Sequence, residues 1–141
     1  MESEIIKSHP SLQRAIDIAL WMNFKYRLDK RRYGVIQDKK AHWYQVVETK
    51  GKRKSSLIDL PAGYSEMTYE QIEAIRTIVN PLHHWEEIVG LFSTAHGEIL
   101  RFILASEIPL EKLIRYELAI RGYDENHLWV GFEKSSSIWL K

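Results

Sequence analysis

Lysine and arginine side chains concentrate in one stretch of this 141-residue chain, residues 25–54. Eleven of its thirty residues are basic and three are acidic, so this stretch has a net charge of +8, whereas the whole chain has +1. Cations at this density can neutralise phosphates, because each one that approaches a nucleic-acid backbone releases a condensed counterion. The charge asymmetry therefore favours DNA or RNA as the partner of this stretch.

The expected contacts come from a helix end, a hairpin and a loop. Lysines and arginines of the loop 50–54 would contact phosphates, and the others would fix the register of the hairpin on the backbone. Tyr44 could stack on a base, whereas we expect Trp43 to lie in the core with Val47. The predicted nucleic-acid-binding residues are Lys30, Arg31, Arg32, Lys39, Lys40, Tyr44, Lys50, Lys52, Arg53 and Lys54.

The basic stretch could instead be neutralised by the rest of the chain. Residues 55–141 contain seven basic and thirteen acidic residues. In that case the protein would be a small interaction module, such as an inhibitor, an immunity-type protein or a phage or plasmid accessory protein. Five tryptophans and seven tyrosines allow this alternative, because both residue types are favoured at the centres of protein interfaces.

Residues able to catalyse a reaction or hold a metal are not arranged convincingly. The chain has no cysteine, and it lacks a phosphate-cradling glycine loop and a nucleophile elbow. Histidines and glutamates lie close together without a His-Glu-x-x-His motif, at His83, His84, Glu87, His96 and Glu98. We therefore predict no catalytic residue, no metal site and no cofactor.

A small nuclease is the second alternative. The spacing of Arg76 and His83 resembles the arginine–histidine spacing of certain helical ribonucleases. Pro81 lies between the two residues, however, and would end the helix needed to hold both on one face. Binding without catalysis is the favoured prediction.

The elements that position the basic residues follow from periodicity and capping signals. Apolar spacing predicts a helix over residues 10–28, and alternation predicts a hairpin from 33–37 and 41–49 followed by a strand at 57–60. A helical region covers 68–121, with a capping box at Thr68 and Gln71 and a glycine stop at Gly122. Residues 126–140 then resemble a closing hairpin.

The order of these elements in the C-terminal half resembles a winged helix-turn-helix, over roughly residues 83–141. That resemblance implies that the helix from Leu110 would lie in a DNA groove. Two glutamates on this helix disfavour phosphate contact. It would display Glu111, Lys112, Arg115, Tyr116 and Glu117.

Length and composition predict one α+β domain, in which an antiparallel sheet from the 33–60 and 126–140 strands packs against helices. The chain shows no apolar run of the length that a membrane span requires, and its N-terminal residues do not resemble a signal peptide. We therefore expect a cytoplasmic protein with no membrane partner, of unknown oligomeric state.

Overall fold

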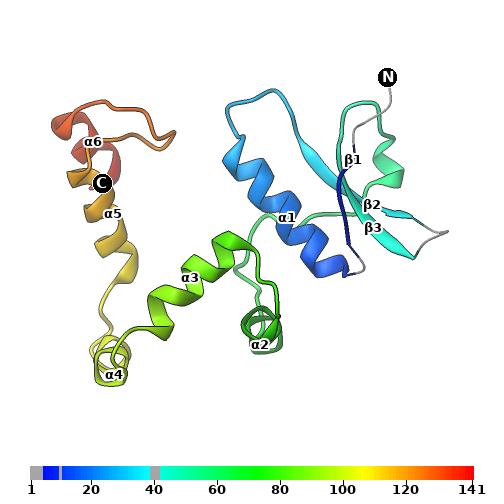
Figure 1. Ribbon diagram of the computed structural model, residues 1–141. Helices are drawn as coiled ribbons and strands as arrows, with labels where there is room; N and C mark the ends of the chain where they lie inside the picture. Colours follow the sequence, from blue (N-terminus) through cyan, green and yellow to red (C-terminus); the bar gives the residue numbers. More distant parts are fainter. Residues whose placement is uncertain (1–4, 10, 39–41) are drawn as a thin grey trace. The chain divides into compact units, whose positions relative to one another are not determined.

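The computed structural model describes residues 5–9, 11–38 and 42–141 (Figure 1). These residues form a three-stranded antiparallel sheet and six α-helices, which confirms the predicted α+β class. Contacts within the chain divide it into two compact units, Met1–Val89 and Gly90–Lys141. The single-domain organisation stays a prediction.

The sheet has the strand order β1-β3-β2, with β1 at Ile5–His9, β2 at Tyr33–Asp38 and β3 at Trp43–Glu48. β2 and β3 pair from Tyr33 opposite Glu48 to Asp38 opposite Trp43, so the predicted hairpin is confirmed. The prediction that strands from 126–140 join this sheet is wrong, because its remaining strand is β1, which pairs with β3. Five residues are too few for alternation to show in the sequence.

The predicted strand at 57–60 is also wrong. Its backbone runs beside β2 for one hydrogen bond, in which the Ile58 N–H donates to the Val35 carbonyl at 2.8 Å. Pro61 follows at once and has no N–H with which to extend a ladder.

Helix α1, Leu12–Lys25, packs against one face of the sheet (Figure 1). The Ser11 hydroxyl accepts a hydrogen bond from the Arg14 N–H at 3.2 Å, and this cap starts the helix at Leu12. Alanines on its inner face allow a close approach to the sheet. The core consists of Ala15, Ile18, Ala19, Tyr33, Val35 and Val46.

Two further helices follow the short 3₁₀ helix η1, Lys54–Ser56. Helix α2, Tyr69–Thr77, has the predicted capping box, in which the Thr68 hydroxyl accepts from the Gln71 N–H and the Gln71 side chain accepts from the Thr68 N–H. Helix α3, His83–Ser93, begins after the predicted break at Asn80-Pro81.

The second unit contains α4 at Gly97–Ala105, α5 at Leu110–Ile120 and α6 at Phe132–Trp139. The predicted hairpin over 126–140 is wrong, because α6 occupies most of it and one bridge, between Tyr123 and Trp129, is the pairing that remains among the described residues. A hairpin would place Ser135 in its exposed turn, whereas Ser135 is fully buried within α6. Its hydroxyl hydrogen-bonds the carbonyls of Leu118 at 3.3 Å and Tyr123 at 3.0 Å.

The wing that a winged helix-turn-helix requires is therefore replaced by a helix. Gly122 ends α5 as predicted, at a φ of 80°. Among residues 5–9, 11–38 and 42–141, no single helix is long and apolar enough to cross a membrane, although α3 and α4 taken together reach the length and composition required.

Candidate nucleic-acid interface

The pairing of β2 with β3 brings two basic loops to the same end of the sheet. Tyr33, the first residue of β2, lies opposite Glu48, the last residue of β3. The Thr49 N–H then donates to the Arg32 carbonyl at 2.8 Å. We call residues 25–32 and 48–54 the basic end; they contain nine basic residues and two acidic ones.

Two of the predicted binding residues, Lys39 and Lys40, lie outside the described residues. Seven of the ten predicted residues gather at the basic end, because the register of β2 and β3 brings their two loops together.

The hairpin is not a free two-stranded ribbon of the kind that enters a major groove. β3 is the central strand of the sheet, with β1 on its other side, and α1 packs against one face. The hairpin is therefore part of a covered sheet, and its cations lie on the loops at its end and not along its strands.

Most side chains of the basic end face solvent. Lys30, Arg31, Arg32, Lys50, Arg53 and Lys54 are exposed, and Lys52 is half-buried. Arg31 forms an ion pair with Glu48 at 3.5 Å, and a hydrogen bond to Tyr33 together with that carboxylate raises the pKa of Arg31. Across residues 5–9, 11–38 and 42–141, the cations of Lys30, Lys52, Arg53 and Lys54 form no ion pair.

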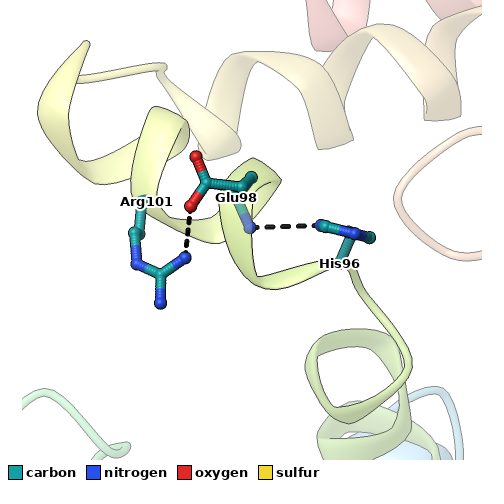
Figure 2. A network of polar contacts seen from close by, with 3 residues as sticks. All are labelled: His96, Glu98 and Arg101. Atoms are coloured by element: carbon teal, nitrogen blue, oxygen red, sulfur yellow. Dashed lines mark hydrogen bonds and ion pairs between the residues drawn. The ribbon is translucent and has the colours of Figure 1, made fainter.

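Acidic residues of the second unit pair with cations on their own helices. Glu98 pairs with Arg101 on α4, and Glu117 pairs with Arg121 on α5 at 3.0 Å. Figure 2 shows the Glu98 carboxylate directed at Arg101. These two pairs are therefore local to their own segments.

The two neighbouring aromatic residues of β3 are placed opposite to our expectation. Tyr44 is half-buried and packs against the core beneath α1, whereas Trp43 is 43% exposed. Trp43 and Val47 lie on the same face of the sheet. Leu57 and Thr49 pack on that face beside Gly34, the partner of Val47, and so cover its basic end, whereas Trp43 lies at the opposite end of β3. The prediction that Trp43 is buried is wrong, and Tyr44 has little free ring surface for stacking.

Sequence reasoning missed a row of flat side chains at the end of α1. The Trp21 ring stacks on His84 at 4.5 Å and lies 6.1 Å from the Phe24 ring. The Arg27 guanidinium lies over Phe24 at 4.5 Å. The apolar residues Trp21, Met22 and Phe24 are the signal in the sequence for this row, and the structure leaves Trp21 38% and Phe24 58% exposed.

Asn23 fixes this row beside the basic end. Its side-chain amide donates to the Tyr33 carbonyl at 2.9 Å and accepts from the Tyr33 N–H at 2.8 Å. The Arg32 guanidinium donates to the Asn23 carbonyl at 3.5 Å. The last turns of α1 and the first residue of β2 therefore hold one another in place.

A buried polar cluster lies on the same helix. Asp17, which is 4% exposed, accepts hydrogen bonds from the Tyr64 hydroxyl at 2.7 Å and from Gln13 at 3.0 Å. Burial raises the pKa of the Asp17 carboxyl, and burial together with the bond to Asp17 raises that of the Tyr64 hydroxyl. Burial also lowers the pKa of His84. This cluster ties the loop before α2 to α1, and it contains no activated nucleophile.

The histidines singled out as metal candidates have separate local roles. The His83 Nε2 lies 3.2 Å from a Glu87 carboxylate oxygen, one turn along α3. His96 caps α4 by accepting from the Glu98 N–H (Figure 2). Within the described part of the chain, no three His, Asp or Glu side chains are grouped as metal ligands would be.

Helix α5 exposes four of the five residues expected on its outer face: Glu111, Lys112, Tyr116 and Glu117. The fifth, Arg115, is half-buried, because its side chain donates to the Trp139 carbonyl at 2.7 Å and lies over the Trp139 ring at 5.6 Å. Glu117 is paired with Arg121. One of the two cations of this face therefore packs within the unit. Arg76 on α2 and His83 on α3 also lie on different helices, as Pro81 predicts.

Comparison with protein-family models, with curated proteins and with solved structures finds no match to this chain. The functional assignment therefore depends on the geometry of the chain's own residues.

Proposed function

We propose that this protein binds nucleic acid at the basic end and catalyses no reaction there. The observation that carries the proposal is the register of the hairpin, which places the 30–32 and 50–54 cations side by side. Four of these cations form no ion pair with any described carboxylate. Phosphates would supply the missing countercharge.

The chemistry of the interface suits the backbone of a nucleic acid better than its base edges. Lysine and arginine side chains on loops contact phosphate oxygens, and such contacts carry no sequence information. We therefore expect modest affinity, a steep dependence on salt and little base preference.

Titration of labelled DNA and RNA at several salt concentrations tests the proposal. We expect saturable binding at 50 mM salt that weakens as a power of the salt concentration. Absence of binding to single-stranded DNA, duplex DNA and RNA at 50 mM salt would refute it. Binding that does not depend on salt would also refute it.

A protein partner is the second candidate, because the second unit exposes large apolar side chains. Phe102 on α4 is 58%, Ile114 on α5 is 61% and Trp129, between α5 and α6, is 58% exposed. Apolar surface of this kind marks an interaction site where it forms one patch. Sedimentation over a hundredfold range of concentration tests self-association, and substitution of Ile114 by Lys should abolish any dimer that forms. A sedimentation coefficient that stays that of a monomer throughout excludes a second copy as the partner.

A further inference from the structure

Trp21 and Phe24 form an aromatic pair that the core does not use. They lie three residues apart on α1, whose inner residues Ala15, Ile18 and Ala19 already pack against the sheet. Phe24 is the more exposed of the pair, at 58%. The Trp21 ring is stacked on His84, so Phe24 is the ring of the pair that offers more open surface to a ligand.

The aromatic pair is joined to the basic end by direct contacts. Arg27 lies over the Phe24 ring and donates to the Phe24 carbonyl at 2.9 Å. Arg32 donates to the carbonyl of Asn23, which is bonded in turn to Tyr33. A strand whose phosphates contact Arg32 would therefore pass beside a ring at a fixed place.

Aromatic faces beside cations suit unpaired bases. Proteins that bind single strands combine a basic track along the backbone with rings on which bases stack, and every base offers such a face. In a duplex the faces of the bases are covered by their neighbours, so a ring on a helix surface adds little. The sheet also offers no two-stranded ribbon for a major groove, because β3 is paired on both sides.

We propose that the basic end binds single-stranded nucleic acid in preference to duplex, with an unpaired base stacked on Phe24 next to Trp21. This inference rests on the proposed function and adds the class of nucleic acid. Phe24 gives the stacking surface, and Arg27 and Arg32 hold the neighbouring phosphates.

Fluorescence anisotropy with three probes tests it: a 12-nucleotide DNA strand, its 12-base-pair duplex, and a 12-unit abasic strand with the same phosphates. We expect Phe24→Ala to weaken binding of the DNA strand by about 5- to 140-fold, the loss of one base–ring stack. Binding of the duplex and of the abasic strand should change less than twofold. Phe24→Tyr should restore binding of the DNA strand.

Phe102→Ala is the matched control, because Phe102 is also 58% exposed but lies on α4. It should leave binding of all three probes unchanged. Thermal melts of each variant report folding, and unchanged binding of the abasic strand separates a stacking surface from a structural role. Salt-dependent binding that Phe24→Ala does not weaken, or that favours the duplex, would overturn this inference and leave the proposed function intact. No binding of any probe at 50 mM salt would overturn both.

Discussion

Removing three cations from the loop after β3 should flatten the salt dependence of binding by a calculable amount. Lys52, Arg53 and Lys54 form no ion pair with any described residue, so each is available to one phosphate. Each phosphate neutralised contributes about 0.9 to the logarithmic salt slope on duplex DNA and about 0.7 on a single strand. Substituting all three by serine should therefore lower the slope by roughly 2.7 on duplex and roughly 2.1 on single strands.

The assay is a set of anisotropy titrations between 50 and 200 mM salt, for the unmodified protein and the triple variant. A second triple variant is the matched control, with Lys112, Lys134 and Lys141 changed to serine. These three lysines are exposed and lie in the second unit. Both variants lose the same charge, so a difference between their slopes reports contact at the loop and not the net charge of the protein.

Two results would refute this reasoning. If the cations are neutralised within the protein, the loop variant should keep the salt slope and lose stability, and high salt should remove that loss. Equal flattening by both triple variants would show that net charge alone controls binding. Otherwise we expect each exposed loop charge to change the free energy of unfolding by no more than about 0.5 kcal/mol.

Two further predictions concern stability. Gly122→Ala should lower the free energy of unfolding by about 1–3 kcal/mol, because its φ is 80° and an added Cβ would clash with the Trp129 ring. Gly90→Ala is the control: its site is helical with open space around it, so this substitution should raise the free energy of unfolding by about 0.5–1 kcal/mol. A Gly122→Ala protein as stable in urea as the parent would contradict the conformation of Gly122. The raised pKa of Asp17 means that the folded state binds more protons above the ordinary value of 3.8, so the free energy of unfolding should fall as pH rises through that window and then level off. Asp17→Asn should remove this fall in urea titrations between pH 3.5 and 7. Tyr64→Phe should extend the fall to higher pH and lower the free energy of unfolding by about 1–3 kcal/mol, because the buried carboxylate loses a hydrogen bond that lowers its pKa. A pH profile shared by all three proteins would contradict the buried state of Asp17.

Elements with a local signal could be predicted from the sequence. The capping box at Thr68 and Gln71 fixes the start of α2 through two short-range hydrogen bonds. Gly122 ends α5 because a backbone at positive φ favours glycine. The β2–β3 hairpin follows from alternation over two strands of six residues. In each case neighbours in the sequence determine the structure.

Elements that depend on distant partners could not be predicted. Serine at position 135 favours a turn, but its hydroxyl donates hydrogen bonds to the carbonyls of Leu118 and Tyr123, so it can be buried within α6. β1 is a strand because β3 offers it an edge. The meeting of the 25–32 and 48–54 segments at one end of the sheet likewise depends on the register of β2 and β3, which charge counting along the chain cannot reveal.

The central place of β3 has a consequence for assembly of the protein. β3 and β2 are close in sequence and can pair early, whereas β1 is separated from β3 by α1 and β2. Until β1 has paired, one side of β3 is an open row of N–H and C=O groups, which could accept a strand from another molecule. β1 is short, and its register shifts between Ile5 and Lys7. Truncation that removes β1 would leave this side of β3 unpaired, so the truncated chain should associate edge to edge through β3 before its helices unfold.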